Sequence, residues 1–343
     1  HLPALEADPA AEIVALADSD PEVLSRAAER FGVGRTFEEA EAMLAAVDPD
    51  AAVVAVPNTL HAPVARACLE RGLHVLLEKP MTVDPADAYD LVDLADRNGL
   101  GLIIGYPWHY NSQVLEVRAA ITGGRIGEVE AVSCLFASIV RELYRGRPER
   151  YGDVLGYTLT TPRGATYSDP ASSGGGQGQS QLTHAAALLQ WLTGLEPVEV
   201  AAFTANQDVG MDLVDAASVR FSNGAIGSIV STGGVVPAQP EYLEYRIFGR
   251  AGHVLLDVNG GTASLHLADG SVEPFDDLPE EQRYPESAPV RDLVAVAQGR
   301  EANGSPALLG ARTVALVDAM YRSARDGHAA RTPGYGTQAG GQA

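Results

Sequence analysis

The first third of this 343-residue chain alternates short apolar runs with helix-like segments. The runs lack polar alternation, as strands buried on both faces do. Asp20-Pro21 and Asp84-Pro85 each place a capping residue before a proline at the first helical position, and Gly32 closes the helix that follows the first pair. Strands connected through helices predict right-handed crossovers and a parallel sheet, as in a nucleotide-binding α/β domain running to about Gly105. The expected strands are 12–17, 51–56, 74–77 and 100–104.

The remainder of the chain has mostly the pattern of β-structure. Segment 138–173 is long, irregular and rich in Arg, Tyr, Gly and Pro, which favours an insertion that covers a substrate. Asn223-Gly224 predicts a hairpin turn, and 307–325 predicts a closing helix. Strands in immediate succession predict an antiparallel sheet. The expected strands are 128–137, 199–204, 215–221, 225–232, 242–248, 252–257 and 262–267.

Charge and composition exclude several classes of function. The formal net charge is −21, which disfavours binding to nucleic acid or to anionic membranes. No apolar run is long enough to span a membrane. Cys68 and Cys134 cannot form a disulfide scaffold, so we expect a reducing compartment and a cytoplasmic protein. We expect no metal site, because the histidines do not cluster and the two cysteines lie far apart. No G-x-S-x-G elbow of a serine hydrolase is present.

Lys79 is the single lysine among 24 basic residues. It lies in Glu78-Lys79-Pro80, directly after an expected parallel strand, where ligands bind in such sheets. A compact ammonium that can lose its proton suits a catalytic position that arginine cannot fill. Chance and an ordinary surface pair of Glu78 with Lys79 are the alternatives.

Two further segments follow expected parallel strands. Asp18 ends the first strand, where a carboxylate can accept hydrogen bonds from an adenosine ribose and repel a 2′-phosphate. The alternative is a helix cap, a role that Asp20 already fills. The segment 57–61, Pro-Asn-Thr-Leu-His, follows the second strand and is weaker, since an ordinary strand-to-helix turn looks similar.

A glycine-rich segment, 173–184, leads into an expected helix that ends at Gly194. It matches neither a Walker loop nor G-x-G-x-x-G. A flexible linker is one interpretation. The other is a helix start that presents Gln177, Gln181 and His184 to a ligand, with His184 taking a proton from a hydroxyl. A purely structural histidine remains the alternative.

Together these segments resemble the glucose–fructose oxidoreductase, inositol dehydrogenase and rhizopine-catabolism (Gfo/Idh/MocA) family over nearly the whole chain. The most specific motifs are Glu78-Lys79-Pro80, Gly105-Tyr106, Gly124-Arg-Ile-Gly-Glu128 and the glycine-rich start of the His184 helix. The resemblance implies an α/β fold: a Rossmann domain at 1–107, followed at 108–331 by a substrate-binding and oligomerisation domain with a large open, mostly antiparallel sheet. We expect a disordered tail at 332–343.

The resemblance also implies roles for individual residues. Lys79 would hydrogen-bond the reacting oxygen, and His184 would be the general base. The expected contacts of an NAD cofactor (NADP being the lesser expectation) are Asp18, Ser19, Pro57, Asn58, His61, Glu78, Lys79 and His109. The expected substrate contacts are Tyr106, Trp108, Tyr167, Ser180 and Gln181.

This sequence departs from the family pattern at three places. It begins at His1, inside what resembles the first helix, so the first strand and glycine loop are missing. A gap in the parallel sheet and weak NAD binding are therefore expected. Ser180 stands where the family usually has an aspartate four residues before the histidine, and His109 stands where it often has arginine.

The resemblance implies an NAD-dependent oxidoreductase that acts on a hydroxyl of a sugar, glycoside or cyclic polyol as a homodimer or homotetramer. One alternative is an NAD-dependent glycosidase that works by transient oxidation and elimination. Another is a non-catalytic sensor that binds NAD and sugar, which the missing aspartate at Ser180 favours.

Overall fold

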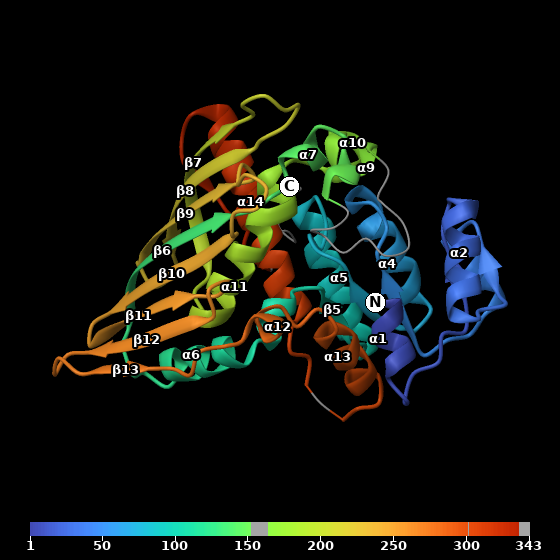
Figure 1. The fold of residues 1–343 in the computed structure, drawn as a ribbon, viewed down its shortest axis with the longest axis horizontal. Coiled ribbons are helices and arrows are strands. Elements are labelled where there is room, and N and C mark those ends of the chain that lie inside the picture. The colour runs from blue at the N-terminus through green and yellow to red at the C-terminus, as the bar shows by residue number, and fades with distance from the viewer. Residues whose placement is uncertain (152–163, 301, 336–343) are drawn as a thin grey trace, which may run out of the picture.

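The computed structural model describes residues 1–151, 164–300 and 302–335. Figure 1 shows a large sheet on one side of the molecule and a smaller α/β region on the other. Between them lie the helices that cover the inner face of the large sheet. None of the helices in the described part of the chain is both long and apolar enough to cross a membrane.

A three-stranded parallel sheet forms the centre of the α/β region. Its strands, in spatial order, are β3 (Ala51–Val54), β4 (His74–Leu77) and β5 (Leu102–Ile104). Successive side chains of a strand point to opposite faces, so this sheet has two cores. One face packs against α4 (His61–Glu70), α5 (Pro85–Asn98) and the start of α14 (Ala307–Asp326). The other face is covered by α1 (Leu2–Ala7) and α13 (Ala288–Ala297).

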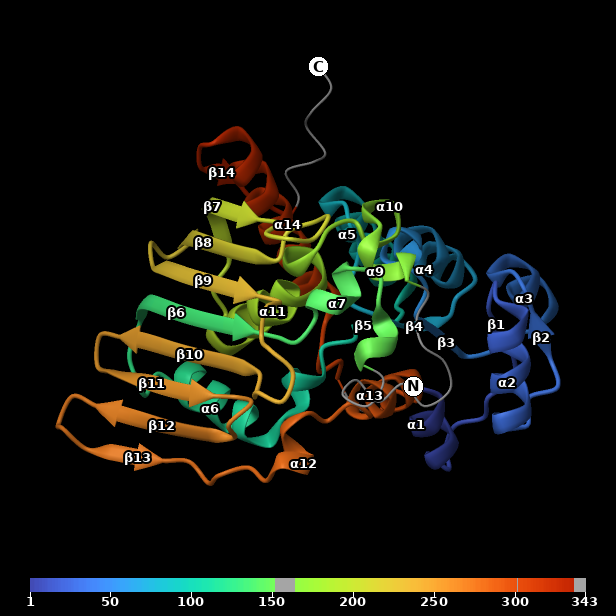
Figure 2. The ribbon, with the colours of Figure 1, turned by 45° about the horizontal axis from the view of Figure 1, so that its top comes forward.

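The parallel strands before β3 form a second, separate sheet. It pairs β1 (Leu16–Ala17) with β2 (Thr36–Phe37), beside α2 (Pro21–Phe31) and α3 (Ala40–Ala46). The gap expected in the parallel sheet is therefore present, and Figure 2 shows this unit set apart from β3. The strand expected at 12–17 is too long, because only Leu16 and Ala17 find a partner strand.

The large sheet has nine strands among the described residues. The order is β13-β12-β11-β10-β6-β9-β8-β7-β14, and every neighbouring pair is antiparallel except β6 with β9. Expectation and structure agree within about two residues for the seven predicted strands; β13 and β14 were not predicted. The strands are β6 (Val129–Ala137), β7 (Pro197–Ala205), β8 (Val214–Phe221), β9 (Ile226–Thr232), β10 (Tyr242–Gly249), β11 (Gly252–Asp257), β12 (Thr262–Leu267), β13 (Val272–Pro274) and β14 (Ala330–Arg331).

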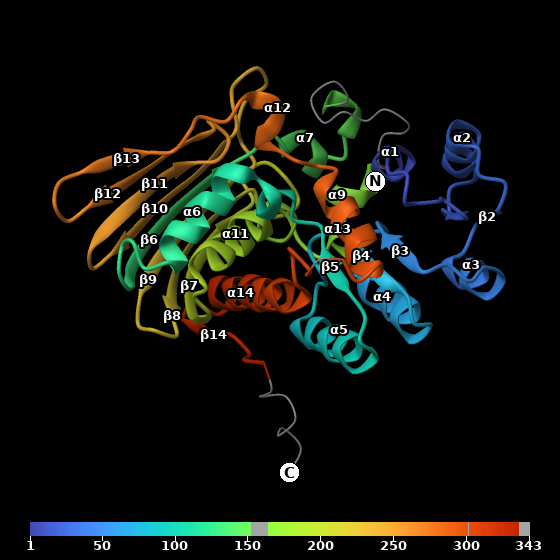
Figure 3. The same ribbon diagram turned by 90° about the horizontal axis from the view of Figure 1, so that it is seen from below.

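Within the described ranges, the helices that pack on this sheet cover its inner face. Figure 3 shows α6 (Ser112–Thr122), α11 (Thr183–Thr193) and α14 side by side along its inner face. The outer face exposes large apolar side chains, among them Phe203 at 83% and Ile226 at 53%. The expected homodimer or homotetramer stays a prediction.

The insertion at 138–173 contains short helices where the sequence predicted only irregular chain. Residues 152–163 of it lie outside the described part. Thr332 donates to the carbonyl of Pro197, and Tyr335 donates to Asp93, so the expected disordered tail is ordered at its start. Residues 336–343 lie outside the described part. The remaining short elements are η1 (Asn58–Leu60), η2 (Pro107–Tyr110), α7 (Arg141–Tyr144), η3 (Pro148–Tyr151), α9 (Ala165–Ser168), α10 (Pro170–Ser173), η4 (Gly178–Leu182) and α12 (Glu280–Arg283).

Candidate active site

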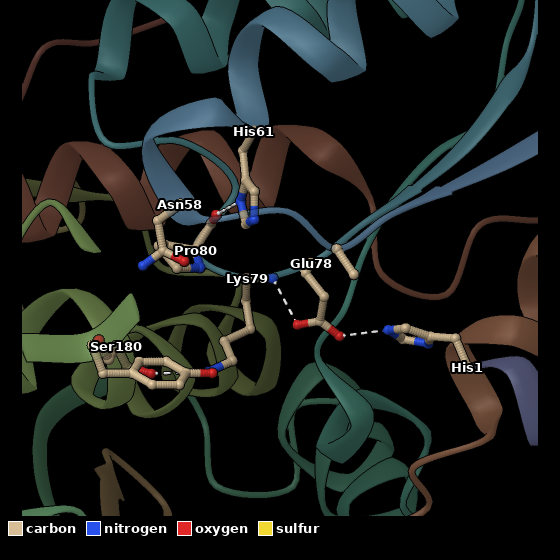
Figure 4. A pocket seen from close by; sticks show the side chains of 9 residues that line it. His1, Asn58, His61, Glu78, Lys79, Pro80 and Ser180 are labelled. Carbon is tan, nitrogen blue, oxygen red and sulfur yellow. Dashed lines mark hydrogen bonds and ion pairs between the residues drawn. The ribbon is translucent and has the colours of Figure 1, made fainter. Parts of the chain in front are cut away.

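Lys79 lies directly after β4, at the carboxyl end of the parallel sheet, as the sequence predicted. Its Nζ donates a hydrogen bond of 3.0 Å to the carbonyl of Ser180, which belongs to the other half of the molecule (Figure 4). The peptide bond between Lys79 and Pro80 is cis. Burial lowers the pKa of Lys79 from its ordinary value, although the neighbouring Glu78 carboxylate raises it. Lys79 is therefore a half-buried lysine with a lowered pKa at the junction of the two halves.

Glu78 binds groups on both sides. One carboxylate oxygen is 2.8 Å from Nε2 of His1, and the other accepts the backbone N–H of Lys79. Burial opposes its ionisation, but His1 and Lys79 outweigh burial and lower the pKa of Glu78 to about 2. The same contact raises the pKa of His1 against the effect of burial. Glu78 is thus an anion held beside the lysine.

A cavity of about 270 Å³ opens at these side chains. It lies at the carboxyl ends of β3 and β4, where ligands bind in parallel sheets. Most of its lining residues belong to the α/β region, and Tyr167 and Ser180 line it from the other half of the molecule. The lining residues are His1, Ala55, Asn58, His61, Glu78, Lys79, Pro80, Tyr167 and Ser180.

His184 lies in the first turn of α11, four residues after Ser180. It is 5% exposed, and its Nδ1 is buried with no hydrogen-bond partner among the described residues. Burial, and next the charge of Lys79, lower the pKa of His184 well below its ordinary value. The imidazole is therefore neutral near pH 7, with nitrogen available to accept a proton.

Aromatic rings enclose His184. Its ring centroid is 5.2 Å from that of Trp108 and 5.8 Å from that of Tyr106, both edge-on, and Phe136 completes the enclosure. Tyr106 is oriented by a 3.0 Å hydrogen bond to the hydroxyl of Thr183. Tyr106 and Trp108, both expected to contact substrate, thus lie against the candidate base. Gln181 is half-buried in the same turn of chain as Ser180.

Asn58 and His61, expected to line the cofactor, do line the cavity and also make structural contacts. Nδ2 of Asn58 donates to the carbonyl of Ser173 at 2.9 Å. The two ring nitrogens of His61 lie 2.7 Å from the carbonyl of Pro80 and 2.9 Å from that of Val56. His61 thereby fixes the backbone on both sides of the cavity.

Asp18, Ser19, Pro57 and His109 do not line this cavity. Asp18 is exposed at the end of β1, where its carboxylate accepts the N–H of Asp20. Ser19 is exposed beside it, and Pro57 precedes η1. His109 is 1% exposed, lies 3.0 Å from the hydroxyl of Ser305 and stacks on Trp191. Burial lowers its pKa to about 3, which makes it a neutral core residue in this structure.

These residues fit a nicotinamide dinucleotide in two respects. The cavity at the strand ends presents the amine of Lys79, and the imidazole of His184 is enclosed nearby by aromatic rings. The exposed carboxylate of Asp18 is available to ribose hydroxyls. The described residues contain no group of three or more His, Cys, Asp or Glu side chains arranged to hold a metal ion.

Sequence reasoning missed three residues that shape the site. His1 was not expected to bind Glu78. Asp212 and Tyr321 hold the glycine-rich segment in place. The only signal for Asp212 was a pair of aspartates, 212 and 215, in an otherwise apolar stretch.

Comparison with protein families places both halves of the chain. Residues 1–106 match the model described as "Oxidoreductase family, NAD-binding Rossmann fold". Residues 114–255 match the model of the GFO/IDH/MocA C-terminal domain. The two matches together span most of the chain.

Among characterised proteins, the chain is 40% identical over 135 residues to dTDP-3,4-didehydro-2,6-dideoxy-alpha-D-glucose 3-reductase of Streptomyces violaceoruber, covering 39% of each chain. It covers only 38–40% of the length of the first relatives that it matches. A longer match, 25% identical, covers 93% of this chain and 91% of D-xylose 1-dehydrogenase (NADP(+)) 2 of Haloferax volcanii.

Among solved structures, one similar chain is the WlbA dehydrogenase of Chromobacterium violaceum in complex with NADH and UDP-GlcNAcA. The TM-score is 0.75 at 27% identity, over 97% of this chain and 92% of that one. With two domains in the same order and a matching fold, this chain belongs to the Gfo/Idh/MocA family of oxidoreductases.

Proposed function

We propose that this protein oxidises or reduces a hydroxyl carbon of a sugar, glycoside or cyclic polyol with NAD. The observation that carries the proposal is the electrostatic coupling of Lys79 with His184, together with the hydrogen bond from Lys79 to Ser180, four residues before His184. Lys79 and His184 come from opposite halves of the chain. Lys79 is half-buried and lines the cavity, His184 is buried outside that lining, and the charge of Lys79 contributes to the lowered pKa of His184. Perturbed groups at a cavity between domains are typical of acid–base catalysis.

In this proposal His184 transfers the proton and Lys79 stabilises the charge on the substrate oxygen. A bound nicotinamide would exchange hydride with the substrate carbon. In oxidation, neutral His184 takes the hydroxyl proton, and the Lys79 ammonium donates a hydrogen bond to the oxygen as negative charge develops on it. In reduction, the protons move in the opposite direction. Trp108 and Tyr106 exclude water around His184 and offer aromatic surface to the apolar face of a sugar.

The cofactor preference follows from Asp18. Its exposed carboxylate at the end of β1 suits two ribose hydroxyls and repels a 2′-phosphate, so we expect NAD rather than NADP. The Haloferax relative is named for NADP(+), so this preference needs its own measurement.

The remaining contacts are proposed for the cofactor and for the substrate. We propose that the cofactor is lined by Ser19, Pro57, Asn58, His61 and Glu78. His109, buried against Trp191, fits this role least well. Tyr167, Ser180 and Gln181 are proposed to contact substrate.

The experiment is a panel of sugars, glycosides and cyclic polyols with NAD and with NADP, followed by absorbance of the reduced cofactor in the full-length protein. We expect net reduction of NAD with at least one member, loss of that activity in His184→Asn, and full activity in the control His328→Asn, an exposed histidine. Sugar turnover without net NADH would favour the glycosidase. Cofactor binding without turnover would favour the sensor.

A further inference from the structure

Asp212 lies outside the cavity lining and accepts hydrogen bonds from the glycine-rich segment that leads to His184. We propose that it is a positioning residue, whose carboxylate clamps the start of the helix carrying His184 and so sets His184 against Lys79. This inference rests on the proposed function, in which His184 and Lys79 act together.

The clamp is a set of hydrogen bonds to consecutive residues of the glycine-rich segment. Oδ1 of Asp212 accepts the N–H of Gly176 at 2.9 Å, and Oδ2 accepts the N–H of Gly178 at 2.7 Å. The backbone carbonyl of Asp212 accepts the N–H of Gln177 at 2.9 Å. Asp212 is only 6% exposed, so these bonds form away from water, where hydrogen bonds to a charged group are strong.

The glycines are needed for this approach. A Cβ on Gly176 would lie 2.2 Å from the carbonyl oxygen of Asp212, and one on Gly178 would lie 2.7 Å from the hydroxyl of Tyr321. Only residues without side chains let Asp212 and Tyr321 come this close to the backbone. The segment is therefore a fitted surface rather than the flexible linker that its composition also allowed.

Tyr321, on α14, extends the clamp toward Lys79. Its hydroxyl donates to Asp212 and accepts the N–H of Gln179 at 3.0 Å. The side chain of Gln179 then donates to the carbonyl of Thr82 at 3.1 Å, three residues after Lys79. A continuous path of hydrogen bonds thus runs from Asp212 to the loop that carries the lysine.

The clamped segment continues into the residues of the site. Gly178–Leu182 form a turn of π-helix, a geometry frequent at functional sites. The carbonyl of Ser180 in this turn accepts Nζ of Lys79, and His184 follows in the first turn of α11. A shift at Gly176 or Gly178 would therefore move the Lys79 acceptor and the base together. A displacement of about 1 Å in such a pair can lower a rate about 100-fold.

The test is steady-state kinetics of Asp212→Asn in the full-length protein, with the best substrate from the panel. The amide replaces one acceptor by a donor that faces a backbone N–H. We expect kcat to fall about 10- to 100-fold while KM and the NAD dissociation constant change less than about threefold. The matched control is Asp277→Asn, the same substitution at an exposed aspartate, and its kcat should stay within about twofold.

If Asp212→Asn does not fold, Tyr321→Phe is a second variant that tests the same hydrogen-bond path. It keeps the ring and the carboxylate but breaks the path to Gln179, and a several-fold loss of kcat at constant KM is expected. Wild-type kcat in folded Asp212→Asn or in Tyr321→Phe would overturn the positioning role, and so would equal losses of kcat in Asp212→Asn and Asp277→Asn. His184→Asn is measured alongside: if it stays active the proposed function fails, and if it alone is inactive only the clamp fails.

Discussion

At the scale of single residues, Asp215 is a buried carboxylic acid with a raised pKa. Its side chain is fully buried beside the Asp212 carboxylate. Two carboxylates so close cannot both ionise easily, and Asp212 is the one bound to backbone N–H groups. Burial first, and the Asp212 charge next, raise the pKa of Asp215 to about 9. Asp215 is therefore a neutral carboxylic acid at pH 7.

Replacing Asp215 by Asn should stabilise the protein more at high pH than at low pH. Between its ordinary pKa of 3.8 and about 9, the folded state holds a proton that the unfolded state has lost. The free energy of unfolding therefore falls as pH rises, by up to about 1.4 kcal/mol per pH unit, and the amide removes this dependence. Urea unfolding at pH 5 and pH 8 measures it. The exposed Asp277→Asn is the control, and an equal effect of Asp215→Asn at both pH values would contradict the assignment.

At the scale of elements, the glycine-rich segment leaves no room for added side-chain volume at Gly176. Gly176→Ala places a methyl group against the backbone of Asp212. A Cβ on Gly210, two residues before Asp212 in the sequence, meets nothing within 4 Å. We expect Gly176→Ala to lower the free energy of unfolding by about 1–3 kcal/mol and to lower kcat. Gly210→Ala should change neither. Equal unfolding midpoints and rates for the two variants would show that the segment is not closely fitted.

Most elements could be predicted from local pattern. Val75, Leu76 and Leu77 form an unbroken buried run, so β4 was predicted at its observed ends. The ends of β10, β11 and β12 were predicted within one residue, because glycine or polar turns bound them. In each case the signal lies within the segment itself.

The elements that were missed depend on distant partners. α13 packs Val290 and Leu293 on a sheet formed some 190 residues earlier, and nothing local marks that contact. β2 exists only because Leu16 and Ala17 lie beside it. β6 itself was predicted as a strand, but its position between β9 and β10 and its parallel pairing with β9 were not, because succession along the chain cannot reveal them.

In the candidate site too, the residues with a local sequence signal were predicted and those held by long-range contacts were not. Lys79 and His184 carry local signals, a strand-end Glu-Lys-Pro and a glycine-rich helix start. The structure places Lys79 3.0 Å from the carbonyl of Ser180, four residues before His184, and their catalytic roles stay predictions. Asp212 and Tyr321 act through long-range hydrogen bonds, which sequence patterns do not encode. His109 resembles a ligand contact in the sequence, yet the structure buries it against Trp191.

At the scale of the whole molecule, the two halves are tied together around the cavity. Asn58 and Thr59, after β3, bind the carbonyls of Ser173 and Ala171 at α10. α14 packs against α5 of one half and α11 of the other, and α13 returns from the end of the chain to cover the parallel sheet. The cavity at Lys79 thus has walls from both halves, and its geometry belongs to the whole chain.

The substitution Lys79→Arg tests this account most directly. It keeps the positive charge but replaces a compact ammonium, fitted 3.0 Å from the Ser180 carbonyl, by a wide fork that does not deprotonate. The measurement is kcat for NAD-linked oxidation of the best panel substrate, with Arg246→Lys on the exposed outer sheet as control. We predict that Lys79→Arg loses at least about 100-fold in kcat while Arg246→Lys is unchanged. Near-full turnover in a folded Lys79→Arg protein would contradict the central role of the lone lysine.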